Sequence, residues 1–167
     1  INEVLDLSMI ENGRLVLTVG EVDLRALALE METMFSQRCE ESGIAFAIEF
    51  EGLAHPLVEG DGLRLQQVFM NMLGNAVKFT PAGGTVAIAA VREEATGDVL
   101  VTVSDNGIGI ASENQERIFE RFFQVDSSAT RIYSGSGLGL ALVREYAVAQ
   151  GYTVTVESCL LYTSDAA

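Results

Sequence analysis

Residues 61–81 read DGLRLQQVFMNMLGNAVKFTP, and they carry the strongest structural signal in this chain. Asp61 is a favourable helix N-cap, and Thr80-Pro81 disfavours continuation, so we predict a helix that runs to about Phe79. Apolar side chains recur at helical spacing and predict one buried side: Val68, Phe69, Met72, Leu73 and Ala76.

A polar stripe runs along the same predicted helix, because its members are three or four residues apart: Arg64, Gln67, Asn71, Asn75 and Lys78. An amide oxygen is a good ligand for Mg²⁺, which binds few protein groups and keeps water and phosphate oxygens. Asn75 is therefore the candidate metal ligand, and Lys78, about one turn further on, could neutralise phosphate. A solvated helix face is the alternative.

The remaining segments are assigned by hydrophobic period and by Gly and Pro breaks. Helices are expected at 4–10, 22–42 and 138–150, with a short helical piece near 113–119, and strands at 14–17, 44–50, 85–91, 99–104 and 152–157. Consecutive strands occur together with α–β alternation. This order predicts an α/β (α+β) two-layer sandwich, with a mixed sheet covered on one face by helices.

Composition narrows the classes of function. The chain has 167 residues and a net charge of −14 with only ten Lys and Arg, which argues against nucleic acid as a partner. An acidic protein that binds a polyphosphate needs a divalent metal and well-placed cations.

Cys39 and Cys159 have no metal-ligand spacing, which fits a reducing cytoplasm. No apolar run is long enough to cross a membrane.

Two glycine-rich turns follow predicted secondary structure. Asp105-Asn106-Gly107-Ile108-Gly109-Ile110 comes directly after a strand, where an Asp could accept a hydrogen bond from an exocyclic amine. Gly135-Ser136-Gly137-Leu138-Gly139-Leu140 opens the last long helix, where backbone N–H groups could face a polyphosphate. Plain glycine turns are the alternative. A dinucleotide fingerprint is disfavoured, because that motif belongs in the first turn of a βαβ unit.

In this order, the Asn-bearing helix and the two glycine turns resemble the Bergerat ATP-binding fold of the GHKL superfamily. The residue sequence of these motifs resembles sensor histidine kinases of the hybrid type. The matching segments are 71–81 (N box), 105–110 (G1 box), 118–124 (F box), 126–131 (the loop that covers the nucleotide) and 135–140 (G2 box). Residues 5–13 resemble the end of the dimerisation helix of that family. The resemblance covers about residues 1–158.

The resemblance implies a role for each matched residue. Asn75 would bind Mg²⁺, Asn71 and Lys78 would lie at the phosphates, and Asp105 would bind the adenine amine. The remaining implied contacts to ATP are Gly107, Gly109 and Ile110 in the first turn, Phe119, Phe122 and Arg131 around the covering loop, and Gly135, Ser136, Gly137, Leu138 and Gly139 in the second turn.

The resemblance also implies partners: the chain's own dimerisation and phosphoacceptor domain, a response regulator receiver domain, and a second copy in a homodimer. This chain would be cytoplasmic, and its parent protein could be anchored in a membrane. His55 precedes Pro56 and a short predicted strand, so it is interpreted as a surface loop residue, and the phosphoacceptor histidine is expected outside this chain.

The predicted organisation has three parts: 1–19 as the end of the dimerisation helix and linker, 20–158 as the ATP-binding domain, and 159–167 as a non-native tail that resembles translated adapter sequence. An ordinary strand and tail is the alternative for the last part. Two departures from the family pattern are Ser134, where Gly is frequent, and the expected absence of the final strand after Ser158.

Three functions remain open. The first is transfer of the γ-phosphate of Mg-ATP to a histidine. The second is a hydrolytic GHKL ATPase, and the third is a nucleotide-binding regulatory module without turnover. Hydrolytic relatives have a Glu where this chain has Asn71, and Asn cannot act as a general base, which favours transfer.

Overall fold

The computed structural model describes residues 3–124 and 137–158. Its elements in chain order are α1 (Glu3–Glu11), β1 (Gly20–Asp23), α2 (Leu24–Glu41), β2 (Ala45–Glu49), β3 (Leu57–Gly60), α3 (Gly62–Lys78), β4 (Thr85–Arg92), β5 (Val99–Asp105), the 3₁₀ turns η1 (Ser112–Asn114) and η2 (Arg117–Phe119), and α4 (Gly139–Gln150).

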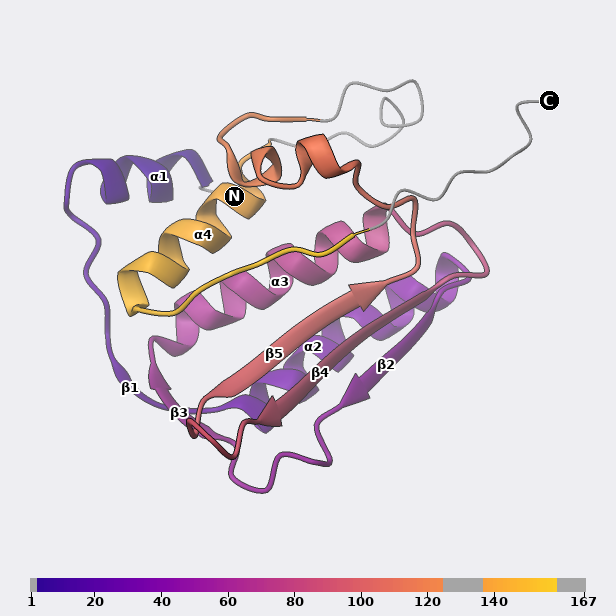
Figure 1. The fold of residues 1–167 in the computed structure, drawn as a ribbon, viewed down its shortest axis with the longest axis horizontal. Coiled ribbons are helices and arrows are strands. Elements are labelled where there is room, and N and C mark those ends of the chain that lie inside the picture. Colours follow the sequence, from indigo (N-terminus) through magenta and orange to yellow (C-terminus); the bar gives the residue numbers. More distant parts are fainter. Residues whose placement is uncertain (1–2, 125–136, 159–167) are drawn as a thin grey trace.

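The larger sheet has the order β2-β4-β5, with β2 parallel to β4 and β5 antiparallel to β4. Figure 1 shows α2 and α3 lying along this sheet, with α4 beside α3 and α1 beside α4. On β4, the buried side chains alternate and join one apolar core with α2 and α3: Val86, Ile88 and Ala90. The predicted two-layer sandwich with a mixed sheet is confirmed.

Local signals set the ends of the helices. The Asp23 carboxylate caps α2 by accepting from the N–H groups of Arg25 and Ala26, and Asp61 caps α3. Gly151 ends α4 with a φ of +80°, a left-handed conformation that glycine adopts without strain. The predicted bounds of these three helices are confirmed to within two residues.

Three predicted elements are wrong. Residues 14–17 are not a strand. The strand β1 begins further along the chain, at Gly20, and pairs with β3 in a small antiparallel sheet. Residues 152–157 have alternately half-buried side chains but form no ladder with a described strand. The helical piece near 113–119 is two separate 3₁₀ turns. Alternation indicates which side chains are covered, but a strand also requires a partner for its N–H and C=O groups.

None of the helices in the described ranges has both the length and the hydropathy that a membrane span requires.

Candidate functional site

The C-terminal half of α3 presents the predicted polar stripe. Asn71, Asn75 and Lys78 are half-buried, whereas the neighbouring Leu73, Ala76 and Val77 point into the core. The Asn71 side chain donates from Nδ2 to the carbonyl oxygen of Gly139 at 3.2 Å, which places the first residue of α4 against this stripe. The stripe is therefore a partly covered surface shared by two helices.

Lys78 is the cation of this surface. Burial lowers the pKa of Lys78, and the positive charge of Arg38 lowers it further. Its ammonium lies 5.3 Å from the centroid of the Phe79 ring, and within the described ranges it has no carboxylate partner at ion-pair distance. In a chain of net charge −14, an unpaired and half-buried ammonium is a suitable group for binding an anion.

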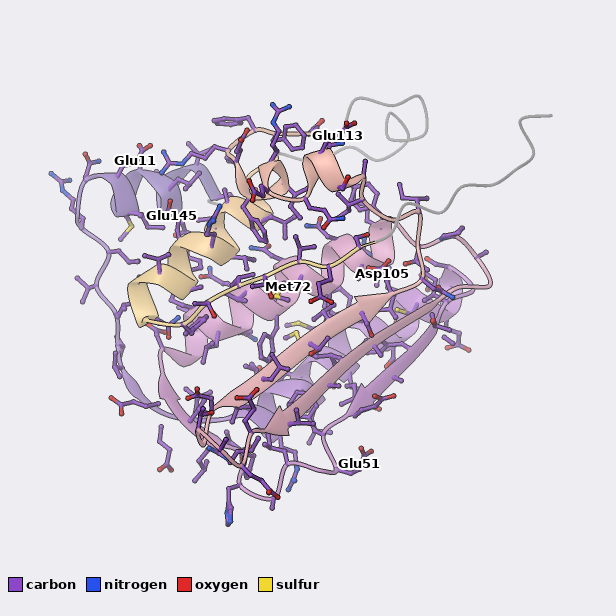
Figure 2. All side chains as sticks on the ribbon, in the orientation of Figure 1. Glu11, Glu51, Met72, Asp105, Glu113 and Glu145 are labelled. Carbon is purple, nitrogen blue, oxygen red and sulfur yellow. The ribbon has the colours of Figure 1, made fainter. Side chains whose placement is uncertain are left out.

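The first glycine turn packs against the end of α3. The Asp105 carboxylate accepts from the N–H of Gly107 at 2.9 Å, and the N–H of Ile108 donates to the carbonyl of Phe79 at 3.2 Å. Gly107 is buried, and a Cβ placed there would collide with the same Phe79 carbonyl. Asp105 lies at the end of β5 (Figure 2), so the turn meets α3 one residue beyond Lys78.

The sequence motifs did not indicate every residue that shapes this turn. The N–H of Thr85 donates to Oδ1 of Asn106 at 2.7 Å, which fixes the turn to the start of β4. The N–H of Ile110 donates to the hydroxyl of Ser158 at 2.8 Å. An Asn within a glycine turn could have suggested the first contact, but Ser158 carries no such signal, because it lies 48 residues away in the chain.

The second predicted turn is described only from Gly137 onward. Gly137 has a φ of +73°, and a Cβ on it would lie 2.8 Å from the Cα of Phe122. The N–H of Phe122 donates to the carbonyl of Gly137 at 2.9 Å, and Phe122 itself has a φ of +62° with a largely exposed ring. Phe122 and Gly137, which are separated by the covering loop, are therefore in direct backbone contact.

The other predicted residues of these two segments are placed as follows. Phe119 is half-buried, with the Arg144 guanidinium 5.3 Å from its ring centroid, and Leu138 is buried at the start of α4. Gly109 has a φ of +77°. Arg131, Ser134, Gly135 and Ser136 lie outside the described residues.

An open groove of about 500 Å³ lies elsewhere, at β1 and the N-terminal halves of α2 and α3. None of the residues predicted to bind nucleotide lines it. The candidate site is therefore identified from its side chains and turns and not from this groove. It lies at the opposite end of α3 from the groove.

A mixed sheet covered by helices, an amide-bearing and cation-bearing helix, and a glycine turn after a strand are the parts of an ATP-binding domain of the histidine kinase type. The chain belongs to the HATPase_c family, described as "Histidine kinase-, DNA gyrase B-, and HSP90-like ATPase", which matches residues 60–164.

Curated relatives agree with this assignment. The chain is 40% identical over 146 residues to the non-motile and phage-resistance protein of Caulobacter vibrioides, and 37% identical over 160 residues to the circadian input-output histidine kinase CikA of Synechococcus elongatus. The alignments cover 86% and 95% of this chain but only 17% and 21% of those proteins. The chain therefore spans about a fifth of their length.

Solved structures show the same fold. The full-length ShkA structure in complex with AMPPNP matches with a TM-score of 0.83 and 34% identity, over 95% of this chain and 32% of that one. A catalytic domain of the histidine kinase ThkA matches with a TM-score of 0.67 and 27% identity, over 80% of this chain and 82% of that one. The predicted fold and family are confirmed.

Proposed function

We propose that this chain binds Mg-ATP and that the γ-phosphate is transferred to a histidine outside residues 1–167. The observation that carries the proposal is the packing of the Asp105 turn on the last residues of α3, beside Lys78, which has no carboxylate partner among the described residues. The Asp105 turn meets the C-terminal end of α3 at Lys78, and Asn75 and Asn71 lie about one and two turns back along the same helix.

The purine would bind at the Asp105 turn. One carboxylate oxygen of Asp105 accepts from Gly107, and among the described residues the other has no hydrogen-bond partner. It is therefore available to accept from the exocyclic amine of adenine. Gly107 lets the turn pack closely on the Phe79 carbonyl, and Gly109 adds no side chain that would crowd the base.

The triphosphate would lie toward α3 and the start of α4. Asn75 supplies the amide oxygen for Mg²⁺, and Lys78 balances phosphate charge. Within the described residues no three His, Cys, Asp or Glu side chains gather into a metal site, so Asn75, phosphate oxygens and water would complete the coordination of Mg²⁺. When bound, Mg²⁺ neutralises the charge that develops on the transferring phosphoryl group.

Transfer is favoured over hydrolysis because the site offers no general base at Asn71. Its amide donates to the carbonyl of Gly139, which makes Asn71 a positioning group between α3 and α4. Arg131, Gly135 and Ser136 would complete the phosphate contacts, with Phe119 and Phe122 at the base of the covering loop.

The proposed partners are a phosphoacceptor and dimerisation domain, in a homodimeric parent, and a receiver domain. A structure of ThkA in complex with the response regulator protein TrrA matches this chain with a TM-score of 0.67 and 27% identity, over 90% of this chain and 42% of that one. That complex supports a receiver domain as the partner that accepts the phosphoryl group from the histidine.

Asn75→Ala tests the metal and nucleotide assignment. We expect calorimetry with ATP and Mg²⁺ to show a loss of affinity of at least about tenfold, because the hard oxygen ligand is gone. Asn12→Ala, at the exposed end of α1, is the matched control and should bind as the parent chain does. Unchanged affinity in Asn75→Ala would reject the assignment of that residue.

A purified acceptor domain separates the three functions. Radiolabel from γ-labelled ATP should appear on its histidine, and the appearance should require Mg²⁺. Free phosphate without labelled acceptor would favour a hydrolytic ATPase, and nucleotide binding without either product would favour a regulatory module.

A further inference from the structure

A buried carboxylate at the N-terminus of α3 has no part in the proposed function. Asp61 is 5% exposed, and among the described residues it has no cation at ion-pair distance. Its Oδ1 accepts from the N–H of Arg64 at 3.2 Å, which caps α3. Its Oδ2 accepts from the N–H of Thr18 at 2.9 Å, so the second oxygen holds the segment that joins α1 to β1.

The same residue also contacts the C-terminal end of α4. The N–H of Asp61 donates to Oε1 of Gln150 at 2.7 Å, and Nε2 of Gln150 donates to the hydroxyl of Tyr152 at 2.9 Å. Burial raises the pKa of Tyr152 to about 12, and the Asp61 charge contributes in the same direction. A Cβ on Gly60 would lie 3.0 Å from Oε1 of Gln150, so the cluster is closely packed.

This cluster and the candidate nucleotide site lie at opposite ends of the same two helices. Asp61 and Gln150 join the N-terminus of α3 to the C-terminus of α4, and Asn71 and Gly139 join the helices again about three turns away. Because α3 and α4 are joined at both ends, a segment that is held at Asp61 is also held relative to the residues that face the nucleotide.

We propose that Asp61 is a positioning residue that fixes the α1–β1 linker to both helices of the nucleotide site. The Asp61–Thr18 hydrogen bond then sets how α1 is oriented relative to bound nucleotide. An acceptor group joined to α1 would be oriented by the same bond. The inference rests on the proposed function. Asp61 contacts no reacting group, so its effect is on phosphoryl transfer and not on nucleotide affinity.

Asp61→Asn separates the two roles of the carboxylate. Asn caps helices about as well as Asp, but its NH₂ group cannot accept from Thr18. We expect the amide hydrogen of Thr18 to exchange about tenfold faster or more, with that of Arg64 unchanged. Asp23→Asn is the matched control, because Asp23 caps α2 and, within the part of the chain that the structure describes, accepts from Arg25 and Ala26 alone. It should leave Thr18 exchange unchanged.

The functional readout uses the full-length parent protein with its acceptor histidine. Asp61→Asn should leave Mg-ATP affinity within about twofold and slow transfer to the histidine by about tenfold or more, because the reacting groups are misplaced. Thr18→Pro removes the donor without altering Asp61 and should give the same result, so the test survives if Asp61→Asn fails to fold.

Three results in Asp61→Asn would each overturn the proposal. The amide exchange of Thr18 could be unchanged, the amide exchange of Arg64 alone could be faster, or Mg-ATP affinity and the rate of transfer could fall by equal factors. If the unmodified chain binds no nucleotide, the proposed function fails, while the exchange experiment still reports on the linker contact.

Discussion

At the scale of single residues, Gly107 shows how closely the candidate site is built. The turn after β5 passes against the carbonyl of Phe79, and there is no room for a methyl group between them. The sequence motif indicated a glycine turn near a ligand. The contact that forbids a side chain comes from α3, which lies well before the turn in the chain.

Gly107→Ala should therefore destabilise the fold by about 1–3 kcal/mol, because the turn must move away from Phe79. Chemical denaturation measures this change. Gly74→Ala is the matched control, since a Cβ on Gly74 meets nothing within 4 Å and alanine favours the middle of a helix. A loss as large in Gly74→Ala as in Gly107→Ala would contradict the contact assigned to Gly107.

At the scale of elements, α1 is held against α3 and α4 by one apolar and two charged contacts. Leu7 is buried in the core. Arg64 of α3 lies 3.6 Å from Asp6 and also donates to the hydroxyl of Tyr146 at 3.1 Å. Arg121 pairs with both Glu11 and Glu145, which lie near each other in Figure 2. The Arg121 pairs are more exposed, so they stabilise the contact less.

Leu7→Ala should release α1 from α4, because it removes the side chain that anchors the helix in the core. We expect faster amide exchange throughout α1, with protection of β4 retained. Leu5→Ala, at a side chain that is 59% exposed, should change little. Equal exchange in the two variants would show that the charged pairs, and not Leu7, hold α1 in place.

At the scale of the whole molecule, the buried Tyr146 and the half-buried Tyr152 make stability depend on alkaline pH. Burial raises the pKa of Tyr146 and of Tyr152 from 10.0 to about 12. Between these values the unfolded chain loses protons that the folded chain keeps. Stability should therefore be unaffected by the two hydroxyls below about pH 10 and should fall as the pH rises toward 12.

Urea denaturation at intervals between pH 9 and pH 11.5 measures this slope. Tyr146→Phe removes one of the two ionising hydroxyls and should make the decline shallower. Tyr133→Phe is a control at a position outside the described residues, and it should leave the slope as it was if Tyr146 and Tyr152 dominate. A decline that is equally steep in Tyr146→Phe would rule out a contribution from Tyr146.

The elements that were predicted well are those whose signals are local. Asp61 and Thr80-Pro81 delimit α3, and Gly151 ends α4, because caps and breaks act within one turn of chain. The buried side of α3 could be predicted for a similar reason, because it depends only on apolar side chains three or four residues apart. The N box, the G1 turn and the family could likewise be inferred from contiguous residues, and the family is confirmed.

Tertiary structure decided what depends on residues distant in the chain. Residues 14–17 and 152–157 have the alternation of strands, but neither segment forms one. Near the first segment it is β1 that pairs, with β3, and residues 152–157 pair with no described strand. The Asp61 carboxylate could be predicted as a cap but not as the link to Thr18 and Gln150, which are 43 and 89 residues away. Local sequence determines which conformations the backbone favours, whereas hydrogen-bond partners across the fold are chosen only when the chain has packed.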